Sequence, residues 1–392
     1  MRTAIVTQHY SASGGVPAIA RWLREGLTHV GHDVQVHDLV TSSRDQRSRR
    51  LLAPRSWWRE PSARVSSTDP DLFHWGANWV EFESLRYRPR SELTRALNEY
   101  DLIQVVSGGP ALALAVSEAT PPKALQVATT LLMERRAHLP EFGPVKRIMK
   151  TADLRSLHRL EVKALRAVDH VFVENRWMEQ WVREQGQPQV TFAPPGIDVD
   201  LFKPVGEWDP TRPIIAFGRL GDSRKDWPTA VAAYERFVAG TGLDNRLLLA
   251  GEGPLAAGLV AKLASSPVRD RITMRENVPA AELPGLLASG SVFLQSSLEE
   301  GLGIAGLEAM ACGLPVVATR TVGSAEYVKD GVNGYLVDLS DGKVDVLASR
   351  LKDVLASNRN GAMAEGAIST VRNGFSSGSA LKRFLSVYDG MA

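Results

Sequence analysis

The chain has 392 residues, of which 44% are hydrophobic and 23% are charged, and its formal net charge is +2. This length predicts two domains, and the composition is typical of a globular protein. The near-neutral charge argues against a nucleic-acid partner, and the lack of a long apolar run argues against a membrane-spanning helix. The N-terminus begins with a strand pattern rather than a secretory signal, and the single cysteine, Cys312, excludes an internal disulfide and a zinc cluster. We therefore expect a cytoplasmic protein.

Short apolar segments alternate with amphipathic helical patterns along the chain, which predicts an α/β protein with two doubly wound parallel sheets. The strands expected in the first half are TAIVTQ (3–8), VQVHDLV (34–40), LIQVV (102–106), ALQVATT (124–130), HVFVEN (170–175) and VTFAPPG (190–196). Those expected in the second half are PIIAFGRL (213–220), RLLLAGEG (246–253), ITMREN (272–277), VFLQSS (292–297) and PVVAT (315–319). The helical patterns include Ala18–His29, Thr229–Ala239, Leu255–Ala264, Ala281–Ala288 and Ile304–Ala311.

The expected domain boundary follows from a Pro-rich stretch, Lys203–Pro213, which we interpret as a linker. The N-terminal domain then spans 1–205 and the C-terminal domain 206–375, ahead of a last helix within 376–392. Ligands of doubly wound sheets bind outside the carboxyl ends of the strands, which here predicts a site in a cleft between the two domains.

The first turn between a strand and a helix contains Gly14 and Gly15, in the sequence SASGGVP. Glycines allow a backbone to approach a phosphate or a sugar because no Cβ is in the way. The turn lacks the G-x-G-x-x-G pattern, so a dinucleotide is disfavoured. Because any strand-to-helix turn uses glycine, the pair alone is a weak indication.

A basic and aromatic segment, Ser42–Arg64, follows the second expected strand. Its arginines and its large apolar residues are Arg44, Arg47, Arg49, Arg50, Leu51, Leu52, Arg55, Trp57, Trp58, Arg59 and Arg64. A nearby stretch, FHWGANW, holds Trp75 and Trp79. Three interpretations stay open: a solvated loop with its tryptophans folded onto the protein, an acceptor site in which aromatic rings stack on a sugar or aglycone, and a peripheral docking site for an anionic lipid surface.

Two basic residues, Arg219 and Lys225, lie in the sequence FGRLGDSRKDW, between a buried strand and a helix. Cations fixed at such a place can hold a diphosphate leaving group, which gains negative charge as a glycosidic bond breaks. Isolated basic residues after a strand are more often solvated surface charges, so the interpretation depends on the next motif.

The most informative stretch, Gln295–Asn333, places two carboxylates, Glu300 and Glu308, eight positions apart across the turn that opens a helix. The residues that follow the first carboxylate are Gly301, Leu302 and Gly303. Backbone N–H groups are left free where a helix begins, and they attract phosphate together with the helix dipole. A carboxylate on each side of a phosphate-binding turn suits a ligand with many hydroxyls and a diphosphate, which describes a nucleotide sugar.

This stretch resembles the E-x7-E signature of retaining glycosyltransferases of family 4 (glycosyl transferases group 1), which have the GT-B fold. Further segments resemble that family in order and spacing, namely Gly14-Gly15, Pro195–Asp198, Arg219 with Lys225, Gly251–Pro254 and Asn277-Val278. The resemblance covers nearly the whole second domain and only the ends of the first. It implies two Rossmann-like domains that face each other across a cleft, with the last helix crossing back to the first domain.

The resemblance also implies roles for the residues around the donor. Glu308 is expected to bind the ribose hydroxyls, and Glu300 the hydroxyls of the donor sugar. Arg219, Lys225 and the amides of Gly301–Gly303 are expected to hold and neutralise the diphosphate. The residues expected to carry catalysis are therefore Glu300, Arg219 and Lys225.

Four other residues are assigned to the donor in the same way. Gly14 and Gly15 are expected to close over the donor phosphate, and Asn277 with Val278 to line the nucleobase pocket. Enzymes with the GT-B fold use basic residues and a helix dipole where other transferases use a cation, so no metal and no other cofactor is expected.

One departure from the family concerns the donor sugar. Many members carry a histidine at the end of a strand in the first domain, and the corresponding stretch here, Leu125–Met133, has none. Thr129, Thr130 and, from the next loop, His138 are candidate sugar contacts in its place, and Trp75 and Trp79 are candidate acceptor contacts.

These observations predict a hexosyltransferase that moves a sugar from a UDP- or GDP-sugar to a hydroxyl of a sugar, glycolipid or small-molecule acceptor. Its expected context is the synthesis of cell-envelope glycans, glycolipids or natural products. Two alternatives stay open, a nucleotide-sugar epimerase on the same fold and a non-catalytic GT-B binding subunit. The expected location is the cytoplasm, with peripheral contact at the inner membrane face if Ser42–Arg64 docks on lipid.

Overall fold

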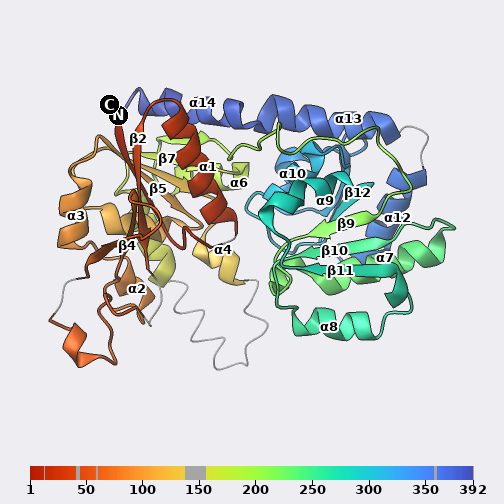
Figure 1. Ribbon diagram of the computed structural model, residues 1–392, viewed down its shortest axis with the longest axis horizontal. Helices are drawn as coiled ribbons and strands as arrows, with labels where there is room; N and C mark the ends of the chain where they lie inside the picture. The colour runs from red at the N-terminus through yellow and green to blue at the C-terminus, as the bar shows by residue number, and fades with distance from the viewer. Residues whose placement is uncertain (13, 41–44, 59–60, 137–155, 357–359, 392) are drawn as a thin grey trace. The chain divides into compact units, whose positions relative to one another are not determined.

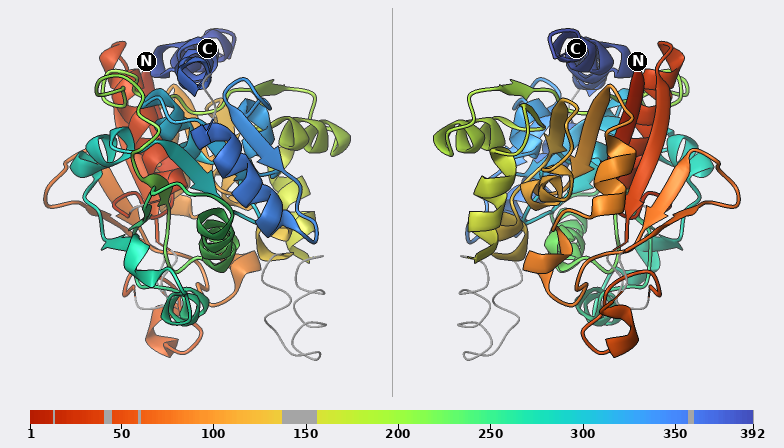
Figure 2. Two further views of the ribbon diagram at one scale, coloured as in Figure 1. Left: turned by 90° about the vertical axis from the view of Figure 1, so that its right-hand side faces the viewer. Right: turned by 90° about the vertical axis from the view of Figure 1, so that its left-hand side faces the viewer.

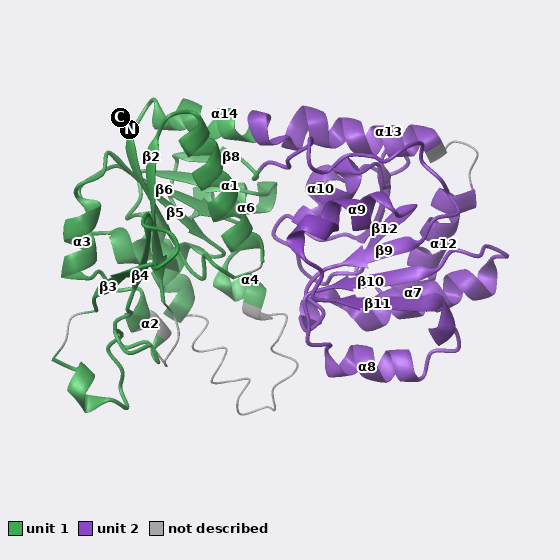
Figure 3. Cartoon of the chain, in the orientation of Figure 1, with its two compact units in different colours: residues 1–195, 380–392 green, residues 196–379 purple. Residues whose placement is uncertain are grey.

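The computed structural model describes residues 1–12, 14–40, 45–58, 61–136, 156–356 and 360–391. The chain divides into two compact units (Figure 3). Unit 1 comprises Met1–Pro195 and Ala380–Ala392, and unit 2 comprises Gly196–Ser379. Each unit is built around its own sheet.

Unit 1 contains an eight-stranded sheet in the order β3-β4-β2-β1-β5-β6-β7-β8 (Figure 1). Its strands are β1 (Arg2–Thr7), β2 (Asp33–Leu39), β3 (Ala63–Val65), β4 (Leu72–Trp75), β5 (Leu102–Ser107), β6 (Lys123–Val127), β7 (His170–Val173) and β8 (Val190–Phe192). β3 runs antiparallel to β4, and the other neighbours are parallel. The central strand β1 is buried from Thr3 to Thr7, as a parallel strand with helices on both faces requires.

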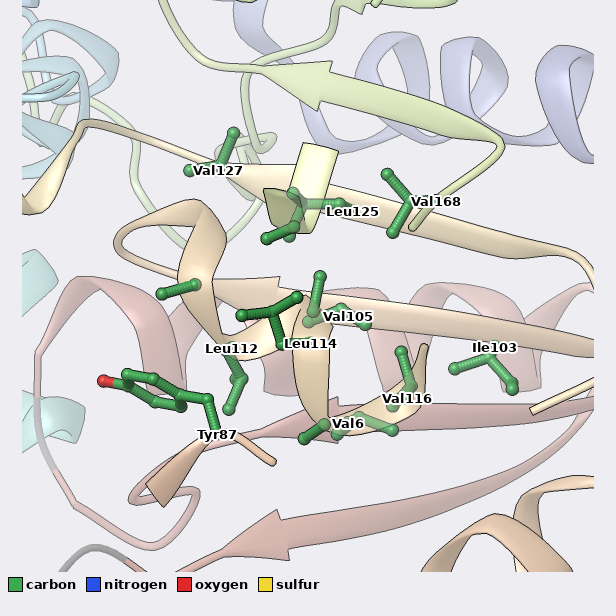
Figure 4. Close-up of a cluster of buried hydrophobic side chains, with 14 of the residues drawn as sticks. Val6, Tyr87, Ile103, Val105, Leu112, Leu114, Val116, Leu125, Val127 and Val168 are labelled. Carbon is green, nitrogen blue, oxygen red and sulfur yellow. The ribbon is translucent and has the colours of Figure 1, made fainter. Parts of the chain in front are cut away.

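Several helical elements of unit 1, among them α3, η2 and α6, share one apolar core with its strands. The helical elements of this unit are α1 (Gly15–His29), η1 (Pro54–Ser56), α2 (Glu83–Arg86), α3 (Ser91–Leu97), η2 (Pro110–Val116), α4 (Leu131–Arg136) and α6 (Arg176–Glu184), with a further helical stretch over 156–165. Figure 4 shows this core, where Leu112 and Leu114 of η2 lie against Val6, Val105 and Leu125 of the strands. All seven residues of η2 are buried, so this short helix belongs to the core.

The last helix, α14 (Ser377–Tyr388), packs on unit 1. The Phe384 ring lies 4.2 Å from the Phe172 ring and 5.7 Å from the Trp22 ring, measured between centroids. The Tyr388 hydroxyl donates to the side chain of Gln104 at 2.5 Å. The C-terminal segment is therefore part of the folded core of unit 1.

Unit 2 contains a six-stranded parallel sheet in the order β11-β10-β9-β12-β13-β14. Its strands are β9 (Ile214–Phe217), β10 (Leu247–Gly251), β11 (Ile272–Glu276), β12 (Val292–Gln295), β13 (Val316–Thr319) and β14 (Gly334–Val337). Its helical elements are η4 (Ser223–Lys225), α7 (Trp227–Gly240), α8 (Ala257–Ala264), η5 (Arg269–Arg271), η6 (Ala280–Glu282), α9 (Leu283–Ala288), α10 (Ile304–Ala311), α11 (Ser324–Tyr327), α12 (Lys343–Ala356), α13 (Asn360–Thr370) and η7 (Val371–Phe375).

Alternating side chains of the unit 2 strands enter two separate cores, one on each face of the sheet. Ile214 and Leu249 pack with residues of α7, α8 and α12, whereas Ile215 and Ala250 pack with residues of α9 and α10. Successive residues of a strand point to opposite faces, so both cores need apolar residues. Figures 1 and 2 show helices on both sides of these strands. The predicted doubly wound architecture is confirmed.

Every strand expected from the sequence is present, and three short ones, β3, β4 and β14, were not expected. None of these three has more than four residues. Within the described residues, no helix has the length and apolar character that crossing a bilayer requires.

The boundary between the units lies ten residues before the expected one. The Ile197 amide donates to the Phe375 carbonyl at 2.7 Å, and Phe202 is buried in a core of unit 2. The Pro-rich stretch expected to be a linker is inside unit 2 as well, because the Trp208 indole donates to the Ser291 carbonyl at 2.7 Å. Packing of these aromatic side chains on unit 2 outweighs the proline content that suggested a linker.

Replacing Phe384 with alanine should destabilise unit 1 by about 3–5 kcal/mol, because it removes a fully buried ring between two aromatic neighbours. Urea unfolding followed by tryptophan fluorescence measures the effect. Lys382→Ala, at an exposed position of the same helix, is the control. Equal stability of the two variants would show that α14 does not support the core of unit 1.

Candidate functional site

The candidate donor site lies at the carboxyl edge of the unit 2 sheet, where two neighbouring strands end in loops. Because β9 and β12 pair in parallel, their following loops leave the sheet at the same edge. The Leu298 amide donates to the Arg224 carbonyl at 2.7 Å, and the Ser296 hydroxyl donates to the Lys225 carbonyl at 2.8 Å. The two motifs singled out in the sequence are therefore adjacent in space.

Lys225 and Glu300 form an ion pair between these loops. The Lys225 Nζ lies 2.6 Å from Glu300 Oε1, and the Ser297 hydroxyl donates to the same oxygen at 2.6 Å. Both charged side chains are largely buried, with 20% and 12% of their area exposed. An ammonium has three donors, so the bond to Glu300 leaves Lys225 two more for a ligand. Glu300 Oε2 accepts from no donor of the described chain.

Arg219 is held by a second set of ion pairs. Its guanidinium contacts Asp222 at 2.7 Å, Arg224 contacts the same carboxylate at 2.8 Å, and Arg224 also reaches Glu299 at 3.0 Å. Burial disfavours the charged form of Asp222, but the two guanidiniums outweigh it and lower its pKa to about 2. The Arg219 side chain is 51% exposed and that of Arg224 is 15% exposed. Arg219 is therefore the arginine of this pair that a ligand can reach.

Glu308 lies on α10, eight residues after Glu300. Its side chain is half-buried, and burial raises its pKa to about 8. No donor or cation of the described residues contacts its carboxylate. A carboxyl group in this environment is costly to ionise unless a ligand donates hydrogen bonds to it.

The loop before α10 is shaped by close packing on Tyr327. Gly303 has a φ of +88°, and its carbonyl accepts a hydrogen bond from the buried Tyr327 hydroxyl at 3.2 Å. A Cβ at Gly306 would lie 2.3 Å from the same hydroxyl, and a Cβ at Gly323 would lie 2.5 Å from the Leu302 carbonyl oxygen. Side chains at these positions would displace the loop, so its path depends on these glycines.

The first amides of α10 are available to a ligand. Those of Leu302, Gly303 and Ile304 donate to no oxygen of the described chain. Gly301, which the sequence pattern grouped with them, has an interaction within the chain. Unpaired amides at a helix start are suited to bind phosphate.

Asn277 and Val278 follow β11, on the same edge of the sheet. Asn277 has a φ of +53°, its amide donates to the Gly251 carbonyl at 2.6 Å, and its Oδ1 accepts from the Gly253 amide at 3.1 Å. Val278 packs partly on the core. The strand-end turns of β10 and β11 are thus joined, while contact with a nucleobase stays a prediction.

The unit 1 residues expected at the donor lie at the carboxyl edge of that unit's own sheet. Gly14 directly precedes α1, and its φ of +122° requires glycine, whereas a Cβ on Gly15 would meet open space. Thr129 and Thr130 follow β6 and are buried. The Thr130 hydroxyl accepts from the Met133 amide at 3.1 Å, and the Thr129 hydroxyl has no partner among the described residues. Thr129 therefore has the free hydroxyl of the two.

The tryptophans expected at the acceptor differ in their surroundings. Trp75 ends β4 in the core of unit 1, and its indole donates to His37 at 3.0 Å. Its ring is therefore not presented to an acceptor, which corrects the expectation. Trp79 is half-buried and lies edge-on to Trp57, with 5.9 Å between their ring centroids. His138 lies outside the described residues.

Several residues that build the site had no role in the sequence analysis, namely Asp222, Arg224, Ser297, Glu299 and Tyr327. The alternation of Asp222 with two arginines was the only local signal for their pairing. Tyr327 lies 24 residues after Gly303, so no local pattern links them. Within the described residues, no group of three or more His, Cys, Asp or Glu side chains is arranged to hold a metal ion.

Part of the chain matches a known family. Residues 211–357 match the model of the family described as glycosyl transferases group 1. A relative from Mycolicibacterium smegmatis, a GDP-mannose-dependent alpha-(1-6)-phosphatidylinositol monomannoside mannosyltransferase, is 33% identical over 43% of this chain and 48% of its own. The 2-deoxystreptamine glucosyltransferase of Streptomyces kanamyceticus is 33% identical over 36% of each chain. The chain thus spans less than half the length of these curated relatives.

Solved structures match the whole chain in fold. Sucrose-phosphate synthase from Thermosynechococcus elongatus superposes with a TM-score of 0.71 at 20% identity, covering 100% of this chain and 99% of its own. HepE from Anabaena, in complex with UDP-glucose, has a TM-score of 0.68 at 14% identity and covers 100% of both chains. The match to the glycosyl transferases group 1 therefore covers residues within unit 2, and the two doubly wound units have the GT-B fold of the solved structures.

Proposed function

We propose that the protein is a retaining glycosyltransferase that moves a sugar from a UDP- or GDP-sugar to an acceptor hydroxyl. The observation that carries this proposal is the set of groups at one edge of unit 2. There the Lys225–Glu300 ion pair, the half-exposed Arg219 and the unpaired amides before α10 accompany a carboxyl group, Glu308, that has no partner in the described chain.

The diphosphate of the donor would bind to the cations and the amides. Arg219 offers a planar guanidinium, and Lys225 offers the two donors that Glu300 does not use. The amides of Leu302 and Gly303 add donors at the positive end of the α10 dipole. These groups stabilise the charge that develops on the leaving nucleoside diphosphate, and the proposal needs no metal ion for that purpose.

The two carboxyl groups would bind the two sugars of the donor. Glu308 takes the ribose hydroxyls, because it lacks a partner in the described chain and because hydroxyl donors would favour its charged form. Glu300 keeps Oε2 for hydroxyls of the transferred sugar, while Oε1 is fixed by Lys225 and Ser297. A carboxylate fixed on one oxygen can orient a sugar ring with little loss of entropy.

In the proposed reaction, the bond between the sugar C1 and the diphosphate oxygen breaks, and a bond between C1 and the acceptor oxygen forms on the same face. The acceptor proton passes to an oxygen of the departing phosphate. No protein base is required for this step, which agrees with the lack of histidine in unit 2: all eight histidines lie between His9 and His170.

The epimerase alternative would need histidines near the sugar, and unit 2 supplies none. The acceptor is a hydroxyl of a sugar, glycolipid or small molecule. The two relatives are named for different molecules, phosphatidylinositol monomannoside and 2-deoxystreptamine, while both are named as transferases of a sugar. We therefore expect the choice of acceptor to depend on unit 1, where the Thr129 hydroxyl has no partner in the described part of the chain.

UDP or GDP should raise the melting temperature of the protein, since a ligand that binds only the folded state at a hundred times its dissociation constant adds about 2.7 kcal/mol. Arg219→Ala should weaken this binding about 10- to 100-fold by removing a charge-assisted contact. Thermal shift with UDP, GDP, ADP and dTDP measures both. Arg246→Ala, at the opposite end of β10, is the matched control. A lack of response to all four nucleotides would remove the main support for the proposal.

Glu300→Gln should lower kcat about 100-fold or more, because the sugar loses its orienting carboxylate. Binding of the nucleoside diphosphate should be unchanged or up to a few-fold tighter, since Lys225 loses its anionic partner. Donor turnover and calorimetric titration with the diphosphate separate the two effects. Glu299→Gln, which affects the ion pair with Arg224, is the control. Parallel loss of turnover and diphosphate affinity would contradict the role given to Glu300.

Glu308→Gln should stabilise the free protein increasingly as the pH rises from 5 to 8, while it abolishes most of the nucleotide-induced thermal shift. The folded state holds a proton on Glu308 up to about pH 8, whereas the unfolded chain releases it near pH 4.5. Between these values the wild-type protein loses up to about 1.4 kcal/mol of unfolding free energy per pH unit from this group, and glutamine removes that loss.

Melting curves of the wild-type protein and the Glu308→Gln variant, with and without the diphosphate, measure this effect across the pH range. Glu326→Gln in α11 is a matched control on the same unit. A variant that is less stable at every pH, or that keeps the full nucleotide shift, would contradict the assignment of Glu308 to the ribose.

A further inference from the structure

Unit 1 carries a loop with a firmly anchored base and an exposed apolar tip. The Arg49 amide donates to the Ala77 carbonyl at 2.8 Å, and the Val80 amide donates to the Arg49 carbonyl at 3.1 Å. A Cβ at Gly76 would lie 2.5 Å from the Arg47 carbonyl oxygen, so the base of the loop lies directly on the chain that follows β4. The base is therefore part of the folded unit.

The tip itself, Leu51–Trp58, is held in one conformation by its own polar groups. The Ser56 hydroxyl donates to the Ala53 carbonyl at 2.7 Å and accepts from the Arg50 amide at 2.9 Å. The Trp57 indole donates to the Arg50 carbonyl at 3.0 Å. These bonds enclose the short helix η1, which lies at the lower end of unit 1 in Figure 1.

Held in this way, the tip presents its largest apolar side chains to solvent. Trp58 is 91% exposed and Leu52 is 84% exposed, and Leu51 is exposed as well. The Trp57 ring packs edge-on against Trp79, so it does not cover the Trp58 indole from solvent. Four large apolar residues within eight positions, with a fixed backbone beneath them, are unusual for a solvated loop.

Positive charge surrounds these side chains. Residues 45–65 hold six arginines and two acidic residues, a net charge of +4 in a chain whose total is +2. Arg55 within the tip and Arg64 on β3 are exposed, and in the described part of the chain neither forms an ion pair. An apolar tip with unpaired guanidiniums beside it complements a surface whose outer layer is anionic and whose inner layer is apolar.

We propose that the tip Leu51–Trp58 docks on the surface of an anionic phospholipid bilayer. Indole rings favour the region between headgroups and acyl chains, and leucine side chains gain by entering the acyl boundary. The arginines remain at the level of the lipid phosphates, where each basic residue strengthens attachment.

Two other occupants fit the tip less well. A sugar acceptor would use the indole faces but has no use for Leu51 and Leu52, which offer no hydrogen bonds. A second copy of the chain would need about 800 Å² from each partner for a stable interface, more than four side chains on a narrow loop supply. An anionic bilayer uses both the leucines and the unpaired charges.

Sedimentation with vesicles tests the proposal, using phosphatidylcholine alone and phosphatidylcholine mixed with phosphatidylglycerol. The wild-type protein should bind only the mixed vesicles, and more weakly as salt is added. The double substitution Leu52→Ser and Trp58→Ser should weaken binding about tenfold or more, and Arg55→Gln about fivefold. Leu201→Ser in unit 2, at a residue that is 54% exposed, should leave binding unchanged.

Two results would overturn the proposal. In the first, the wild-type protein does not bind mixed vesicles. Self-association through the tip, measured by analytical ultracentrifugation, would then identify a second copy of the chain as the occupant. In the second, binding survives the double substitution. Thermal shift by UDP and GDP on the same variants separates this proposal from the function proposed above, because the donor site lies in unit 2. A variant that keeps the nucleotide shift but loses vesicle binding supports docking by the tip.

Discussion

The ion pair that joins the loops after β9 and β12 is the constraint on which the candidate site depends. Lys225 and Glu300 are both largely buried, and either charge alone would be costly there, so each fixes the position of the other. Together with the pairs Arg219–Asp222 and Arg224–Glu299, it balances three cations with three carboxylates. Without a ligand the edge is thus nearly neutral. A diphosphate must then be held by spare donors on Lys225 and Arg219 and by the α10 amides.

The same loop depends on a residue that contacts no ligand in the proposed mechanism. Tyr327 is completely buried, and its hydroxyl lies against Gly303 and Gly306. The glycines between the two glutamates therefore serve packing as well as phosphate binding. A side chain at Gly306 would collide with Tyr327. We expect α10 to tilt as a result, and Glu308 on that helix would then move relative to Glu300. The spacing of the two carboxyl groups is thus a property of the core of unit 2.

Eleven of the fourteen described strands, and the residues that follow them, could be predicted from the sequence, because strands buried on both faces read as continuous apolar runs. Arg219, Lys225 and Glu300 were found at one edge for that reason. Their ion pairs with each other and with Asp222 were not predictable, since charge pairing depends on loop conformation. Trp75 was misjudged because an aromatic residue in a short strand looks the same in sequence whether it faces the core or a ligand.

The family match covers only residues 211–357, within unit 2. The basic apolar tip, Thr129 and every histidine lie outside this range, in unit 1. Any enzyme that uses a nucleotide-sugar donor needs cations to bind the diphosphate and carboxyl groups to bind the sugar hydroxyls. The acceptor and its surroundings impose no common pattern, so the sequence of unit 1 is free to differ. What distinguishes this protein from its relatives should therefore be sought in the loops of unit 1, beginning with the tip Leu51–Trp58, where Leu52 and Trp58 are almost fully exposed.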